Sequence, residues 1–396
     1  MIKLENNLQC MLSTEQCLKV KQMILTFFQN VPDPRAKDNC KHSFADLLFM
    51  MTLAVFSGAE DIDDIHQYVV YRQHQLECVL GEFTPPSYNT FWWIISRMDP
   101  EAFAQAFYAW SKAKASDDDQ ICIDGKSLRG SLGKNGKCNL HIVHAYAHNL
   151  GMLIGQEKIQ EKSNEITAIP TLLEQLDIRG STVTIDAAGC QKVIVNAIEK
   201  RGGHWIIALK KNQRNFYDSV VKLFEEARKQ DFEYVQNCDF YEGMEKKSGR
   251  IDKRSIAIIS DPSEIELSEE WPGIETFIEV TRETSYGGKK STERRYYISD
   301  RIDSAKEFGR KIQAHWGVES FHWVLDVVFG EDSSNANSLH GAENLGILRR
   351  AAMNWIKGSP QLKKNGFARI RKQAKWSNDD TIIKEICEAL FNVKFF

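Results

Sequence analysis

The chain of 396 residues lacks several features that mark common classes of protein. It contains no CxxC pair, and its nine cysteines are scattered and odd in number. This pattern argues against a zinc ribbon and a secreted disulfide framework, and it favours a reducing cytoplasm. The longest apolar run, residues 47–56 with one threonine, is too short to span a bilayer, and the polar first residues contain no signal-peptide core. We therefore expect a cytoplasmic protein with no membrane partner.

An excess of positive charge is also missing. The formal net charge is −3 at pH 7, so any contact with nucleic acid must come from local basic patches rather than from the total charge. The composition, 42% hydrophobic and 27% charged, is that of an ordinary globular protein with enough apolar material for a core. The length favours roughly two or three domains.

Residues 13 to about 113 carry the pattern of a compact all-α domain. Ser13 begins a capping-box sequence, STEQ, ahead of an amphipathic run. Residues 44–56 are dense in Leu, Phe, Met and Ala, which predicts a buried helix, and residues 61–80 predict another. Ser87 is a candidate cap for a further helix, and Asp99 with Pro100 opens the last one.

From about residue 119 the pattern changes to short strands and intervening helices. Strands are predicted at residues 120–124, 141–148, 152–160, 181–186 and 204–209, and helices at residues 166–176 and 190–200. Three strands followed by alternating helices and strands predict a mixed sheet with helices packed on it. This order is the ribonuclease-H-like one, in which the first and fourth strands are neighbours. The predicted fold class is α/β, with a ribonuclease-H-like core after the all-α N-terminal domain.

Residues 211–298 interrupt this pattern and predict a mostly β insertion. The segment contains a charged helix at residues 216–229 and strands at residues 255–259, 275–284 and 293–298. Residues 305–329 then return to a helical pattern.

Three acidic residues stand out by their local settings. Asp124 and Asp186 end the first and fourth predicted strands, and Glu319 lies on the helical pattern that follows the insertion. Because those two strands are neighbours in the predicted fold, both aspartates can reach one ion. Carboxylate oxygens are the ligands that Mg²⁺ prefers, and two such ions about 3.5–4 Å apart can support phosphodiester cleavage. The three acids therefore predict a metal-dependent enzyme that cuts and joins DNA.

Each acid also has an ordinary structural explanation. Asp124 precedes Gly125 and is compatible with a turn, and Asp186 is compatible with a helix N-cap. Glu319 has competitors in the same stretch, namely Asp326, Glu331 and Asp332. We favour Glu319 because it belongs to a block, HWGVES, that a known family carries.

Blocks of residues along nearly the whole chain resemble the H-repeat-associated transposases, a branch of the DDE insertion-sequence transposases. The N-terminal part contains VPDPR and a PS-x-x-TF block, and the core contains DGK-S-L-RGS, KSNEITAIP and TIDAAGCQK. The third block, HWGVES-x-HWVLDVVFGED, is followed by NLGILRRAAMN. The resemblance implies a ribonuclease-H-like catalytic core, two Mg²⁺ ions that Mn²⁺ could replace, and double-stranded DNA as substrate. Its catalytic and metal-binding triad falls on Asp124, Asp186 and Glu319.

The resemblance also implies a division of labour along the chain. Residues 1–115 are expected to bind DNA ends, residues 116–210 and 299–345 to form the catalytic core around the insertion at 211–298, and residues 346–396 to form a basic helical tail. Since two element ends must be paired, a homodimer or higher oligomer on DNA is expected. The protein would act on the terminal repeats of its element and on target DNA, in the bacterial cytoplasm and at the nucleoid.

Several cations are candidates for DNA contact. The stretch from Leu345 to Lys375 holds nine Lys or Arg and no acid, which favours phosphate contacts. The candidates are Lys126, Arg129, Lys192, Arg349, Arg350, Lys363, Lys364, Arg369 and Arg371. A solvated charged face is the alternative explanation for each of them. His322 and Asp326 share a helical face with Glu319, and we expect them to contact the acidic residues rather than the ions.

Two other functions are compatible with these features. One is a catalytically silent or domesticated DNA-binding remnant, against which the intact triad argues. The other is a nuclease of the same fold that cuts DNA without joining it.

Overall fold

The computed structural model describes residues 15–376 except for a set of short gaps. The gaps are residues 16–17, 19–20, 23–24, 27, 37–39, 113–118, 130–139, 160–163, 234, 335–339 and 360–361. Ser13, the predicted cap of the first helix, lies outside the described residues. In the part of the chain that the structure describes, no helix has the length and apolar character needed to cross a membrane.

The N-terminal part is helical, as predicted. Its helices are α2 (Phe44–Phe56), α3 (Ile62–Tyr71), α4 (Gln73–Leu80), α5 (Tyr88–Arg97) and α6 (Pro100–Lys112). The prediction for α2 is confirmed residue for residue, and Ser87 caps α5 by accepting the N–H of Thr90. The single helix predicted over residues 61–80 is wrong, because the backbone leaves the helical conformation at Arg72 (φ −106°, ψ 16°) and starts a second helix.

One mixed sheet of nine strands forms the centre of the molecule. Its strands are β1 (Gln120–Ser127), β2 (His141–Ala147), β3 (Met152–Lys158), β4 (Thr182–Ile185), β5 (His204–Leu209), β6 (Cys238–Lys247), β7 (Arg250–Ile259), β8 (Thr276–Tyr286) and β9 (Lys289–Ser299). Their order is β3-β2-β1-β4-β5-β9-β8-β7-β6. β4 runs parallel to β1 and to β5, whereas the other neighbouring strands are antiparallel. The first five strands therefore have the ribonuclease-H-like order, and the predicted fold class is confirmed.

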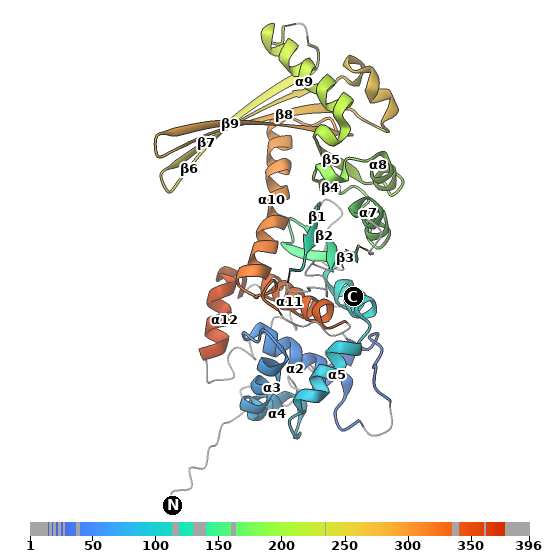
Figure 1. Cartoon of the computed structure of the whole chain (residues 1–396), viewed down its shortest axis with the longest axis vertical. Coiled ribbons are helices and arrows are strands. Elements are labelled where there is room, and N and C mark those ends of the chain that lie inside the picture. Colours follow the sequence, from blue (N-terminus) through green and yellow to red (C-terminus); the bar gives the residue numbers. More distant parts are fainter. Residues whose placement is uncertain are drawn as a thin grey trace, which may run out of the picture.

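The segment at residues 211–298 adds its strands to the same sheet. β9 pairs with β5 in antiparallel register, so β6–β9 continue the core sheet outward as a long arm (Figure 1). β6 was not predicted from the sequence. Its residues alternate poorly between apolar and polar, and its pairing with β7 makes it a strand.

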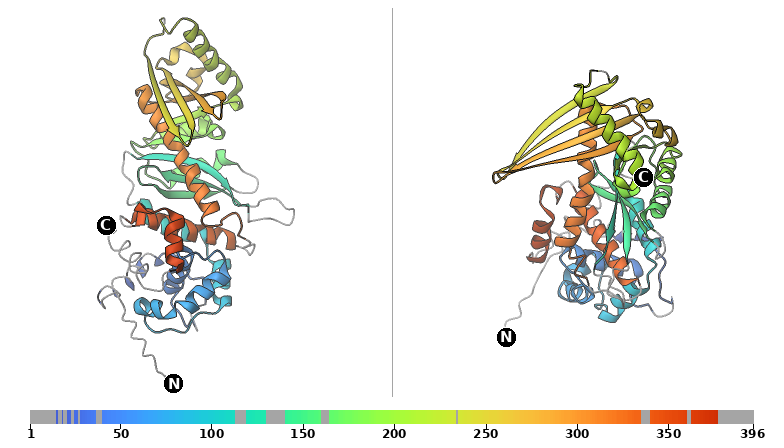
Figure 2. Two further views of the ribbon diagram at one scale, coloured as in Figure 1. Left: turned by 90° about the vertical axis from the view of Figure 1, so that its left-hand side faces the viewer. Right: turned by 45° about the horizontal axis from the view of Figure 1, so that its top comes forward.

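Helices cover the two faces of the sheet differently. α7 (Glu165–Glu174), α8 (Lys192–Glu199) and α9 (Arg214–Lys229) pack on one face through a shared apolar core. The long helix α10 (Ala305–Val327) crosses the opposite face (Figure 2). The first part of α10 packs on β5 and the arm strands, and its middle part crosses β1 and β4, which carry the predicted aspartates.

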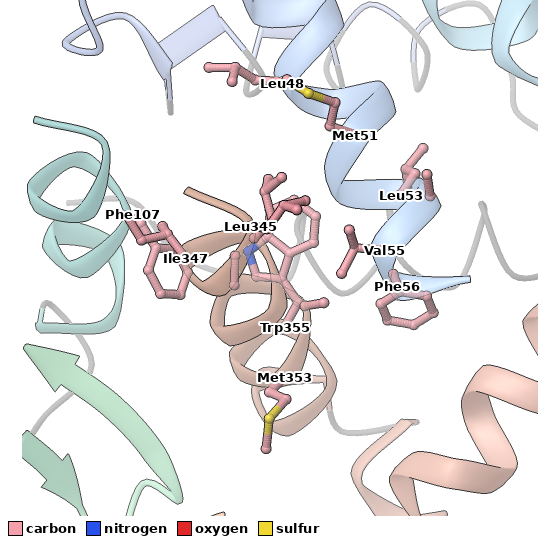
Figure 3. Packing of buried hydrophobic residues seen from close by; sticks show 14 of the residues in the cluster. Leu48, Met51, Leu53, Val55, Phe56, Phe107, Leu345, Ile347, Met353 and Trp355 are labelled. Atoms are coloured by element: carbon pink, nitrogen blue, oxygen red, sulfur yellow. The ribbon is translucent and has the colours of Figure 1, made fainter. Parts of the chain in front are cut away.

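A second core joins the N-terminal helices to the sheet. α11 (Gly341–Gly358) lies between them and buries residues on all sides, with Phe107 of α6 and residues of α2 packed around it (Figure 3). The short helix α12 (Phe367–Trp376) follows at the side. Residues 346–358 of the stretch predicted as a basic tail therefore belong to a central helix of the molecule.

Candidate active site

The two predicted aspartates follow the last residues that pair β1 with β4. Ile123 and Ile185 are partners in the parallel register, so Asp124 and Asp186 come next at the same level. Neighbouring strands lie about 4.8 Å apart, which brings these two positions close together. β1 continues beside β2 to Ser127, so its predicted end at Asp124 was too early.

α10 forms hydrogen bonds with β1 and β4 at successive positions along its length. Near its start, the carbonyl of Lys311 accepts a hydrogen bond from Gln120 (2.7 Å), and the Lys311 ammonium donates to the Thr182 hydroxyl (3.1 Å). One turn later, His315 Nδ1 lies 3.0 Å from the hydroxyl of Thr184. Residues 311, 315, 319 and 322 share one helical face because they are spaced by three or four. The next position on that face is Glu319, at the level of the aspartates.

The charges of the three acids act on one another. Burial raises the pKa of Glu319, and the nearby carboxylate of Asp124 and the more weakly acting Asp186 raise it further. Burial lowers the pKa of His315, and the negative charges of both aspartates offset part of that decrease. The three predicted acids therefore face one region, although they come from positions far apart in the sequence.

Each aspartate is held by a specific partner. Asp186 accepts the N–H of Ala188 (2.9 Å) and so caps the short turn at Ala187–Gly189, whereas the helix predicted from Cys190 starts at Lys192 with Gln191 in the cap position. Asp124 Oδ2 lies 3.4 Å from His322 Nδ1. The second nitrogen of His322 lies 2.9 Å from Nδ1 of His144, which is fully buried on β2.

The two histidines allow one arrangement of hydrogen bonds in which Asp124 accepts from His322. Burial lowers the pKa of His144 well below its usual value, helped by the charge of Arg350, so its ring is neutral. If His144 donates to His322, then His322 can donate its other N–H to the carboxylate of Asp124. We read His322 as a support for Asp124, and His144 as the support of His322.

A fourth carboxylate, Glu165, was not singled out from the sequence. It stands at the first position of α7, and a Cβ on Gly125 would lie only 2.0 Å from its Oε1 atom. Burial raises the pKa of Glu165, followed by the charges of Asp186 and Asp124. The block KSNEITAIP contains it, but only the fold reveals that this helix start lies over the backbone next to Asp124.

The buried side chain of Lys126 contacts acidic residues, among them Asp326. The Lys126 ammonium pairs with Asp326, and it lies 3.2 Å from Glu331 and 3.5 Å from Asp332. These acids raise the pKa of Lys126 although its burial acts to lower it. The Lys126 side chain is thus buried and paired with acids, and its contact with DNA stays a prediction that this geometry does not favour.

Three arginines of the predicted basic tail are also buried. Arg349 and Arg350 are 1% and 0% exposed, and Arg371 is 7% exposed. Arg350 pairs with the buried Glu331 (2.9 Å), and Arg349 donates to the carbonyl of Glu60 (2.7 Å). The contact of these three arginines with DNA stays a prediction that their burial around α11 does not favour.

The remaining cations lie on the surface. Arg129, Lys192, Lys364 and Arg369 are exposed, whereas the side chain of Lys363 lies outside the described residues. Lys192 pairs with Glu270 (2.8 Å).

A cavity of about 380 Å³ opens beside the acids. Asp186, Glu319, His315 and Trp316 line one side of it, and Arg295 of β9 reaches it from the arm. The Arg295 guanidinium lies over the Trp316 ring, 4.9 Å from its centroid. The site is thus accessible from the side where α10 meets the arm.

The donor set suits a hard cation. In the described part of the chain, no three His, Cys, Asp or Glu side chains converge at the spacing of a closed metal site. Mg²⁺ does not require such a cage, because it keeps several waters and binds through one or two carboxylates plus substrate phosphates. Four neighbouring carboxylates, of which Glu165 and Glu319 have raised pKa values, fit this behaviour.

Comparison with known proteins gives consistent similarities. Residues 115–355 match the family model described as transposase DDE domain, and residues 25–111 match the model of its associated domain. YncI of Escherichia coli O157:H7, named as a candidate transposase, is 34% identical over 89% of this chain and 91% of its own length. The H repeat-associated YhhI of Escherichia coli K12 is 34% identical over 87% and 93%. A solved piggyBac transposase complex with hairpin DNA is similar with a TM-score of 0.44 and 9% identity, over 96% of this chain and 85% of that one.

Proposed function

The chain belongs to the family of insertion-sequence transposases with a DDE domain, and from this premise we propose that it cuts DNA at the ends of an element and joins those ends to target DNA. The observation that supports this proposal is the register between β1, β4 and α10. In this register Asp186 and Glu319 line an open cavity, and Asp124 lies on the neighbouring strand beside Asp186.

Asp124, Asp186 and Glu319 would hold the divalent ions. When bound, Mg²⁺ would lower the pKa of a water and stabilise the charge of the leaving oxygen. The chain's own residues do the positioning. His322 holds the carboxyl of Asp124, and the Ala188 N–H holds that of Asp186. Glu165 adds negative charge beside Gly125 and is a further candidate ligand.

DNA contacts would come from several parts of the chain. The N-terminal helices are proposed to recognise element ends, and the exposed cations Arg129, Lys192, Lys364 and Arg369 to contact phosphates. Pairing of two ends would use a homodimer or higher oligomer. Mn²⁺ could substitute for Mg²⁺, since it accepts the same oxygen ligands.

The test is Mg²⁺-dependent nicking of duplexes made from the DNA that flanks the gene, followed by strand transfer with pre-cut ends. We expect Glu319→Gln to lower the nicking rate by roughly 10³-fold or more, as loss of a residue essential to chemistry does. Glu307→Gln is the matched control, because Glu307 lies in the first turn of the same helix and, among the residues that the structure describes, forms an ion pair with Arg310 at the surface.

Three results would contradict the proposal in different ways. Binding without any cleavage by the natural chain would identify a DNA-binding remnant. Cleavage without strand transfer would identify a nuclease. Full activity in Glu319→Gln would show that the third acid was wrongly chosen.

A further inference from the structure

We propose that the face of the arm that looks toward α10 is a phosphate-binding surface for the duplex DNA that reaches the acidic site, with Arg254, Arg282 and Arg295 as its contacts. This inference rests on the proposed function, because it assigns the path of that substrate. In this proposal the arm supplies the cationic surface, whereas Arg349, Arg350 and Arg371 of the C-terminal part are buried.

The three arginines share one face of the sheet by their register. Ile256 and Val280 are partners on β7 and β8, and both belong to the apolar cluster that packs against α10. Side chains two positions apart in a strand point to the same face. Arg254 and Arg282 are partners two residues further out, and Arg295 is the partner of Val280 on β9. The arginines therefore follow directly after the strand residues that α10 covers.

A cavity of about 390 Å³ lies in front of these side chains. All three arginines line it, together with Trp316 and Ser320 of α10. Arg295 and Trp316 also line the cavity that contains Asp186 and Glu319. The two cavities thus lie next to each other, with the stacked Arg295–Trp316 pair in the lining that they share.

The guanidinium groups keep free bonding capacity. Their side chains are 28%, 31% and 35% exposed for Arg254, Arg282 and Arg295. Each contacts one acid: Glu245 at 3.9 Å, Asp252 at 3.0 Å and Glu293 at 2.9 Å, respectively. A guanidinium has five N–H donors, so one carboxylate leaves donors for phosphate oxygens.

Charge and length favour DNA as the occupant. A site built of carboxylates repels the phosphates that it must admit, and cations beside it offset that repulsion. The same face carries further cations toward the end of the arm, Arg250 on β7 and Lys289 on β9, together with the acids Asp252 and Glu293. Arg250 lies four positions before Arg254 in the strand, which is about 13 Å and matches roughly four base pairs of duplex. The arm extends in this direction away from the rest of the molecule (Figure 1).

The experiment measures binding of the full chain to a random-sequence duplex of roughly 30 base pairs, without divalent ions, from about 50 to about 200 mM salt. We expect Arg254→Ala/Arg282→Ala to weaken binding at least tenfold at the lower salt and to reduce the slope of log K against log salt by about 2. Arg254→Lys/Arg282→Lys should retain most of the slope because it keeps both charges.

Lys253→Ala is the matched control. Lys253 neighbours Arg254 in the sequence but points to the opposite face, and its side chain is similarly exposed at 38% and also pairs with one acid, Glu242. We expect it to bind with the slope of the natural chain. A folded double alanine variant with unchanged affinity and slope would overturn the inference, as would an equal loss in the Lys253 variant.

The outcome is separable from that of the proposed function. If the natural chain does not cleave DNA but the arginine variants lose binding, the phosphate surface stands and the enzymatic proposal fails. If the natural chain cleaves DNA and the double alanine variant binds and cleaves equally well, the surface is wrong and the enzymatic proposal stands.

Discussion

At the residue scale, the site combines carboxylates that repel one another. Glu165 and Glu319 both have raised pKa values because of burial and the charges of the aspartates. The fold tolerates this repulsion through local partners, such as the turn capped by Asp186 and the histidine beside Asp124. A site that binds divalent cations is expected to be destabilised in this way when the cations are removed.

Glu165→Gln tests this repulsion through its pH dependence. A carboxyl whose pKa is higher in the folded than in the unfolded chain loses folded-state stability as it ionises. Without divalent ions we therefore expect the variant to be more stable than the natural chain near neutral pH, by less than about 1 kcal/mol. The difference should vanish as the pH falls through the raised pKa of Glu165 toward its ordinary value of 4.5.

Denaturant unfolding at several pH values measures the difference between the two chains. A variant that is less stable at neutral pH, or a difference that grows on acidification, would mean that Glu165 has a stabilising partner instead.

At the element scale, α10 aligns the site because it is anchored to the strands at several levels. Gln120 and Thr182 bind it at one end, and Lys126 binds its other end through Asp326. Lys126 also reaches Glu331, which is fully buried with Arg350. The end of β1, the end of α10 and α11 therefore meet in one buried network of charges.

Lys126→Met should disturb this network strongly. Removal of one member of a buried charge cluster leaves its partners without compensation, which typically lowers the free energy of unfolding by about 3–5 kcal/mol. Because Arg350 still contacts Glu331 in the variant, we expect a smaller loss of about 2–4 kcal/mol. Arg129→Met is the control, since Arg129 also faces Asp332 but its side chain is 82% exposed, and we expect less than about 0.5 kcal/mol.

Chemical denaturation of both variants provides the comparison. A loss in Lys126→Met no larger than that in Arg129→Met would show that the network does not anchor α10.

The elements also show what the sequence could and could not predict. α2 and β5 were predicted at their observed bounds, because dense apolar runs and β-branched residues mark them. The break at Arg72 has no proline or glycine, and β6 is polar, so both depend on packing with other segments. The two aspartates were predicted because each ends a recognisable strand, and Glu319 because it belongs to the HWGVES block. The triad itself remains a prediction, and the burial of Arg349 and Arg350 was missed because composition alone cannot distinguish a basic surface from arginines paired inside.

At the scale of the whole molecule, α11 joins the helical part to the sheet. Asn344 donates to the carbonyls of Ile95 and Met98 in the N-terminal helices. Asn354 bonds to β3, the edge strand of the sheet, by accepting the N–H of Leu153 (3.1 Å) and donating to its carbonyl (2.8 Å). Its amide also donates to Ser111 of α6 (3.1 Å), so one side chain connects three elements.

Asn354→Asp should therefore destabilise the helical part and the sheet together. The carboxylate has nearly the shape of the amide, but it cannot donate to Leu153 or Ser111, and it places a charge where the natural side chain is fully buried. We expect a loss of about 2–4 kcal/mol, since a buried donor pair is removed and an unpaired charge is added. Because one apolar cluster contains residues of α2, α6, α10, α11 and the strands, the loss should appear in a single transition.

Hydrogen exchange of the amides of α2 and of β2 measures both parts in one experiment. Equal acceleration in the two segments is the expected result, with Asn149→Asp on the surface turn after β2 as a control that leaves both unchanged. Acceleration confined to the sheet would show that the N-terminal helices fold independently of α11.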